Sequence, residues 1–197
     1  EIIIDKNTGH GLSARGNGNM LLEINTLGKF NMWGDFHVSE GIYNFKYAGL
    51  FDKELVAKPG GDISWEGDPT RARLNLEAVY KTQANPSVLL ENASFSRNIP
   101  VEVVIQLTGN LMQPDHEFQI NFPNVSSVVK SDLEYRLNDP DMRQKQALSL
   151  LYQRSFLSPT NANSMAYAPL LETASSLFND LFSDDDSKVQ VGVNYVQ

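Results

Sequence analysis

The side chains that could carry acid–base or metal chemistry are scattered along this chain. Its three histidines are His10, His37 and His116, and their spacing matches neither a metal-ligand pair nor a general-base motif. We therefore expect exposed or strand-end histidines. The chain has no cysteine, which removes disulfides, thiolate metal sites and cysteine nucleophiles. No serine stands in a G-x-S-x-G elbow.

Acidic residues and glycines give weaker hints of a site. The three consecutive aspartates at 184–186 do not alternate as calcium ligands do, so we predict a solvated turn and no metal. The pairs Asp62 with Glu66 and Asp52 with Glu54 could flank a glycosidic bond. An acidic hydrolase therefore stays as an alternative. The glycines between 9 and 18 lack phosphate-loop spacing and predict a flexible hairpin.

Composition limits the class of protein. The 197 residues include 16 Lys and Arg against 24 Asp and Glu, a net charge of −8, which argues against a nucleic-acid partner. Hydrophobic residues at 41% suffice for a folded core. No apolar stretch approaches the roughly 20 residues of a membrane-spanning helix. The first residues lack a basic segment and a cleavage site, so we expect no signal peptide.

Residues from about 10 to 123 alternate apolar and polar side chains, as half-buried strands do. Clean alternation is typical of antiparallel sheets with one wet face. Short Gly-, Pro- and Asp-rich breaks join the strands and predict sequential antiparallel neighbours. The expected fold is mainly β, a curled antiparallel meander that forms a groove. Residues 81–99 are expected to be an irregular excursion.

After Pro123 the apolar period becomes helical. Val125, Val128, Val129 and Leu133 predict a first helix, and Asp139 with Pro140 predicts the start of a second. A third helix is expected around residues 170–181, followed by a strand over 189–195. We expect one domain, a fragment of a longer protein, with a β-groove at 1–123, a helical segment at 124–186 and a terminal strand at 187–197.

The most prominent feature is the apolar row along one side of nearly every predicted strand. The residues expected to line this side are Phe30, Met32, Phe36, Val38, Tyr43, Phe45, Ile63, Trp65, Leu74, Leu76, Val103, Ile105, Leu107, Phe118 and Ile120. One interpretation is an ordinary core capped by the three helices. The other is a sheet that leaves part of its apolar face as an open groove.

Several segments resemble the C-terminal domain of the TamB family of AsmA-like bridge proteins. They are INTLGKFNMWGDFHVSEGIYNF at 24–45, GGDISWEGDP at 60–69, ARLNLEAVY at 72–80, DPDMRQKQALSLLYQRSFLSP at 139–159 and KVQVGVNY at 188–195. The resemblance covers most of the chain, and its style is closest to versions from the Bacteroidota.

The resemblance implies a non-enzymatic periplasmic part of an inner-membrane-anchored envelope protein in a Gram-negative cell. The apolar groove of such a protein, a β-taco, would carry phospholipid acyl chains between the membranes or help outer-membrane proteins assemble beside a TamA-type barrel. No cofactor is implied. The family's membrane helix is not recognisable here, and we expect the chain to stop before the family's extreme C-terminus.

Two functions follow as hypotheses. As a lipid conduit, the chain should lose lipid capture, but keep its fold, when Phe36, Phe45 or Leu76 becomes charged. As a chaperone-like platform, it would bind barrel strands by β-augmentation along an open edge, and proline at Val191 should weaken that binding.

Overall fold

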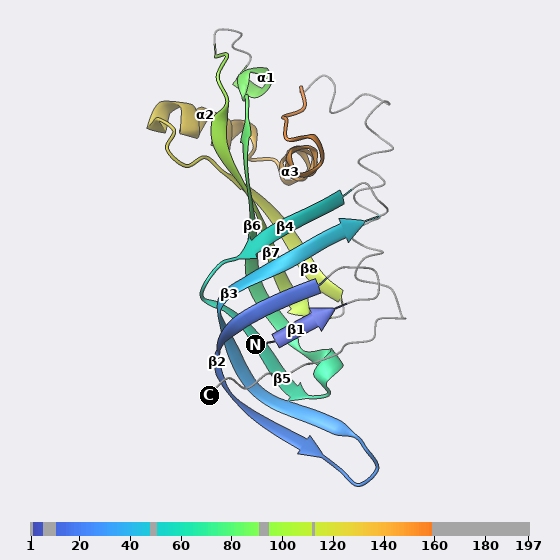
Figure 1. Ribbon diagram of the computed structural model, residues 1–197. Helices are drawn as coiled ribbons and strands as arrows, with labels where there is room; N and C mark the ends of the chain where they lie inside the picture. The colour runs from blue at the N-terminus through green and yellow to red at the C-terminus, as the bar shows by residue number, and fades with distance from the viewer. Residues whose placement is uncertain (1, 6–10, 48–50, 91–94, 112, 159–197) are drawn as a thin grey trace. The chain divides into compact units, whose positions relative to one another are not determined.

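The computed structural model describes residues 2–5, 11–47, 51–90, 95–111 and 113–158 (Figure 1). Contacts divide this part of the chain into two compact units. The first holds the described residues of 1–79 and 106–116, and the second holds those of 80–105 and 117–158.

The described strands form one eight-stranded sheet. They are β1 (Ile2–Asp5), β2 (Gly11–Ile24), β3 (Phe30–Tyr47), β4 (Phe51–Ala57), β5 (Gly61–Gly67), β6 (Arg73–Ala84), β7 (Ile99–Asn110) and β8 (Gln113–Asn121). Their order is β1-β2-β3-β4-β6-β7-β8, with β5 paired to β3 and β6, and the pairings from β1 to β6 are antiparallel. The prediction of a mainly β, antiparallel fold with helices late in the chain is confirmed.

Strand β3 organises the first unit because it is long enough to pair with two shorter strands, β4 and β5, along one edge. It has 18 residues, whereas β4 and β5 have seven each. One edge of β3 pairs with β2, and the other edge pairs with β5 over Met32–Val38 and with β4 over Gly41–Tyr47. β4 and β5 therefore follow one another along a single edge of β3. This is the departure from a simple meander.

The glycines of β2 correct one prediction. Residues 11–24 form a strand, with a shift in its pairing to β3 between Arg15 and Gly16, rather than a flexible hairpin. A Cβ added at Gly16 would collide with the carbonyl oxygen of His37, and one at Gly18 would collide with that of Asp35. Glycine is needed here because the two backbones approach closely.

The α-helices described belong to the second unit. They are α1 (Ser87–Leu90), α2 (Ser127–Arg136) and α3 (Pro140–Gln153), and a short 3-10 turn, η1 (Pro69–Arg71), lies in the first unit. The predicted start of α3 is confirmed, because an Asp139 carboxylate oxygen accepts a 2.7 Å hydrogen bond from the Met142 N–H. Leu133 of α2 is buried as expected, but Val128 is 79% exposed, so its helical spacing did not place it in the core.

Residues 81–84 also differ from the prediction. They continue β6 instead of opening an irregular excursion, and the alternation of burial persists to Ala84, which is buried. Small and polar residues hide this alternation in the sequence. The predicted third helix, the aspartates at 184–186, the final strand and His10 lie outside the described residues.

Candidate functional site

The sheet of the first unit separates apolar from polar side chains by strand register. Phe36 of β3 lies opposite Ile63 of β5, and Ile63 lies opposite Leu74 of β6. Residues directly opposite each other in antiparallel strands point to the same face. All three are buried, so they form one continuous apolar row across three strands.

The adjacent row has the opposite character. His37 lies opposite Asp62, and Asp62 lies opposite Asn75. The His37 Nδ1 atom contacts the Asp62 carboxylate, and both side chains are about half exposed, at 57% and 44%. One sheet face is therefore apolar and the other is polar. The alternation in the sequence predicted this segregation.

A further row extends the apolar face across β2, β3 and β4. Leu12, Tyr43 and Leu55 lie opposite one another across β2, β3 and β4, and all three are buried. Burial also raises the pKa of the Tyr43 phenol well above its usual range, so this side chain is neutral. We call the buried face of the first unit, with these rows, the inner face.

The structure buries nearly every residue expected to line the groove. In the first unit these are Met32, Phe36, Val38, Tyr43, Ile63, Trp65, Leu74, Leu76 and Leu107, and in the second unit they are Val103, Ile105, Phe118 and Ile120. Phe30 is only half buried, and the side chain of Phe45 lies outside the described set. Within each unit, the buried residues of this set share an apolar environment.

Trp65 adds a polar atom to this environment. Its side chain is 2% exposed, and its indole Nε1 is the one buried side-chain nitrogen or oxygen among the described residues that has no hydrogen-bond partner. An unsatisfied buried donor costs about 1–3 kcal/mol. The inner face therefore contains an unpaired donor that an acceptor on a bound molecule could satisfy.

The residues considered for catalysis do not assemble. Asp62 and Glu66 lie four residues apart on β5, which separates their Cα atoms by about 13 Å. Glu66, Asp52 and Glu54 are exposed. His116 is half buried, and that burial lowers its pKa despite the nearby Asp115 carboxylate. No group of three or more potential metal ligands occurs in the described part of the chain.

A shallow hollow also lies away from the inner face. Its volume is about 470 Å³, and its lining consists of Ser13, Arg15, Glu40, Gly41, Ile42 and Val56. The exposed ion pair between Arg15 and Glu40, at 3.4 Å, forms part of this lining. We assign this hollow no function.

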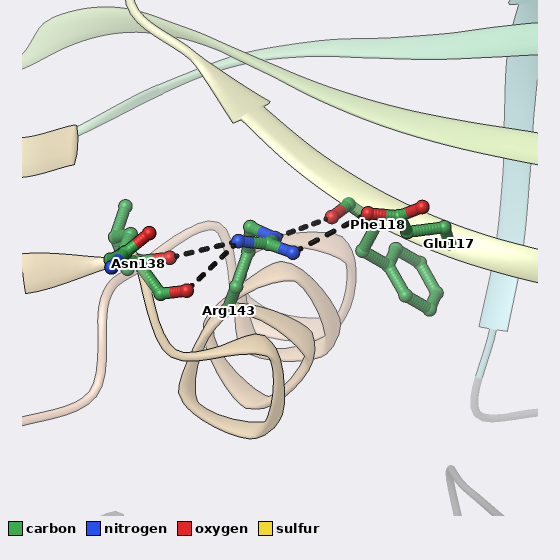
Figure 2. A network of polar contacts seen from close by, with 5 residues as sticks. Glu117, Phe118, Asn138 and Arg143 are labelled. Carbon is green, nitrogen blue, oxygen red and sulfur yellow. Dashed lines mark hydrogen bonds and ion pairs between the residues drawn. The ribbon is translucent and has the colours of Figure 1, made fainter.

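In the second unit, Arg143 joins three segments through its guanidinium group (Figure 2). Its Nε donates a 2.8 Å hydrogen bond to the carbonyl oxygen of Phe118 in β8. Its Nη1 donates to the carbonyl oxygens of Leu137 and Asn138, just after α2, at 3.2 and 3.4 Å. Its Nη2 lies 3.5 Å from a carboxylate oxygen of Glu117. The planar guanidinium group thus donates hydrogen bonds to the carbonyl groups at the end of α2, and it holds α3 beside β8.

Arg143→Lys should lower the free energy of unfolding of the second unit by about 1–3 kcal/mol, because a single ammonium cannot reach all of these acceptors. Chemical denaturation followed by hydrogen exchange of α2 and α3 would measure the change. Arg136→Lys is the control, since Arg136 makes an i, i+4 pair with Asp132 on the helix surface. Equal stability of both variants would contradict this role of Arg143.

One feature was not predicted from the sequence: a group of exposed aliphatic side chains near the turn between β2 and β3. Leu21, Leu22, Ile24 and Leu27 are all exposed there. The sequence does indicate this exposure. The adjacent leucines at 21 and 22 break the alternation of apolar and polar residues, so one of them must face solvent.

A comparison with known protein families shows to which family the chain belongs. The family model for the TamB C-terminal domain matches residues 1–196. The chain belongs to this family. No curated protein matches it. The TamB resemblance is therefore confirmed, whereas the Bacteroidota origin stays a prediction.

TamB proteins are envelope proteins that act with TamA in the translocation and assembly module, which serves outer-membrane biogenesis. Within the described residues of this TamB domain, no helix has the length and apolar character needed to span a membrane.

Proposed function

We propose that this TamB domain is a non-enzymatic periplasmic bridge segment whose inner face binds phospholipid acyl chains on their way between the inner and outer membranes. The observation that carries the proposal is the apolar row from Phe36 through Ile63 to Leu74, continuous across three strands. An acyl chain that enters such a face gains about 0.8 kcal/mol for each buried CH₂ group. Because this gain is non-directional, the lipid can slide.

The buried indole of Trp65 supports the same proposal. Its unpaired N–H is a donor within an otherwise apolar surface. The ester carbonyl oxygens of a phospholipid adjoin the acyl chains and accept hydrogen bonds. A lipid that separates the buried side chains and reaches Trp65 would satisfy this donor.

Lipid content of the purified domain tests the proposal. The domain, produced in the periplasm of a Gram-negative host, should retain phospholipid through gel filtration, measured by organic extraction and mass spectrometry. The double variant Ile42→Ser with Val56→Ser is the control, because these opposite residues are exposed on the polar side and should not affect retention. Lipid content no higher than that of an unrelated periplasmic protein would contradict the proposal.

A second candidate function is a platform that pairs with strands of outer-membrane proteins. The observation that favours it is the edge of β2. Strand β1 pairs with β2 only up to Ala14, so residues 15–24 have no strand on that edge within the described structure. Unpaired strand edges bind extended segments through backbone hydrogen bonds. The position proposed earlier for a proline test, Val191, lies outside the described residues.

Proline substitutions at Asn19 and Met20 test this second function. N–H groups of neighbouring strand residues point to opposite edges, so one of the two positions donates to the open edge and the other donates to β3. If β-augmentation operates, the substitution at the open edge should weaken binding of a barrel-strand peptide while the sheet remains folded. Unchanged peptide binding in the folded variant would exclude it.

A further inference from the structure

The end of the β2–β3 hairpin exposes a concentration of aliphatic side chains. Leu27 at the turn is 92% exposed, and Ile24, Leu21 and Leu22 are 73%, 66% and 45% exposed. Strand β5 pairs with β3 only from Met32 onwards, so the end of the hairpin consists of β2 and β3 alone. Figure 1 shows this two-stranded ribbon ending in the turn. We call residues 21–30 the hairpin tip.

The turn of the hairpin tip, residues 25–29, forms hydrogen bonds within itself. The Asn25 side-chain oxygen accepts hydrogen bonds from the N–H groups of Leu27 and Lys29, at 3.0 and 2.8 Å. The Asn25 N–H donates to the Lys29 carbonyl oxygen, and the Gly28 N–H donates to the Asn25 carbonyl oxygen. These hydrogen bonds reduce the number of unpaired peptide groups at the turn, and unpaired peptide groups are costly in hydrocarbon. The exposed Leu27 on this turn is therefore suited to a shallow position at a lipid surface.

Charge and aromatic residues at the tip have the pattern of a membrane interface. Lys29 is the single charged residue between Ile24 and Gly34, although the whole chain carries a net charge of −8. Phe30 and Trp33 are half buried at the base of the tip. Aromatic rings and lysines commonly lie at the headgroup level of bilayers, and the cation complements anionic lipids.

We propose that the hairpin tip inserts shallowly into the surface of a lipid bilayer that contains anionic lipid. The carboxylate of Glu23 sets the depth, because it must remain among the headgroups. From Glu23 to the turn the strand spans about 7–10 Å, which agrees with the depth reached by interfacial segments. Ile24 and Leu22 lie opposite Phe30 and Met32, on the face that continues into the buried inner face. The tip would thus touch the membrane where the apolar face becomes exposed.

Vesicle flotation with the purified chain tests this binding. The vesicles contain phosphatidylethanolamine and phosphatidylglycerol, and the chain should float with them. The double variant Ile24→Asp with Leu27→Asp should partition at least about tenfold more weakly, because two exposed aliphatic side chains are lost. Val128→Asp is the matched control, since Val128 is 79% exposed on α2 of the second unit, and it should bind like the unmodified chain.

Three results would overturn the proposal. The first is failure of the unmodified chain to float, and the second is flotation of the tip variant equal to that of the unmodified chain. The third is loss of a dimer in the tip variant without loss of vesicle binding, which would show that the tip contacts a second copy of the chain. Circular dichroism of each variant checks that the β content of the chain is unchanged. The proposal does not require lipid within the inner face, because lipid retention by a detached domain and docking to vesicles are separate measurements.

Discussion

Leu76→Asp should unfold the first unit of this TamB domain. The Leu76 side chain is 3% exposed, and its Cδ2 atom lies close enough to Gly61 that a Cβ there would approach it to 2.6 Å. A carboxylate at this position would be buried without a partner, and such changes cost more than about 4 kcal/mol. Hydrogen exchange should rise throughout β3, β5 and β6.

Val56→Asp is the matched control for this prediction, because Val56 is 55% exposed on the sheet of the same unit. We expect its free energy of unfolding to change by less than about 1 kcal/mol. Native-like exchange protection in Leu76→Asp would show that the inner face is solvated. Because Phe36 and Leu76 are buried, at 4% and 3% exposure, we expect a charge at either residue to unfold the unit, in contrast to the expectation from sequence that the domain keeps its fold. Charged variants cannot separate lipid capture from folding.

Gln146→Leu should strongly destabilise the second unit. Gln146 is fully buried in α3, and its side-chain amide pairs with the backbone of Leu157 in both directions. Its Nε2 donates to the Leu157 carbonyl oxygen, and the Leu157 N–H donates to its Oε1, both at 2.8 Å. Leucine would leave both peptide groups buried and unpaired, at about 1–3 kcal/mol each. Denaturant titration should show the loss.

Gln153→Leu makes the same chemical change on the same helix but at an exposed residue, whose amide donates to the Ser149 hydroxyl at 2.9 Å. We expect this control to lose less than about 1 kcal/mol. If the two variants lose equal stability, the pairing of Gln146 with Leu157 does not hold the segment after α3.

The sequence predicted the sheet well because binary alternation follows directly from strand geometry. The alternation of Phe36 and Val38 with His37 assigned each to its observed face. The start of α3 followed from a local signal, the Asp139 cap before Pro140. Such features depend on neighbouring residues alone, and they can be read without knowledge of the fold.

Features that depend on tertiary partners could not be predicted in the same way. That β4 and β5 share one edge of β3 is decided by pairing between distant segments. Gly16 and Gly18 resembled a flexible loop, although close approach of β3 is what requires them. No local signal marks Gln146 as buried, because its partner, Leu157, lies in the segment after α3. Whether alternating apolar residues form a sealed core or admit lipid is likewise undecided by periodicity.

Photo-crosslinking in cells tests the central claim, that the inner face takes up phospholipid, most directly. A small aryl azide amino acid would replace Tyr43 on the inner face or its neighbour Ile42 on the opposite face, in the whole protein. The two positions are adjacent in β3 but point to opposite sides of the sheet. We predict that phospholipid adducts form at position 43 and are scarce at position 42. Equal labelling of the two positions, or no lipid adduct at position 43 in folded protein, would contradict the account.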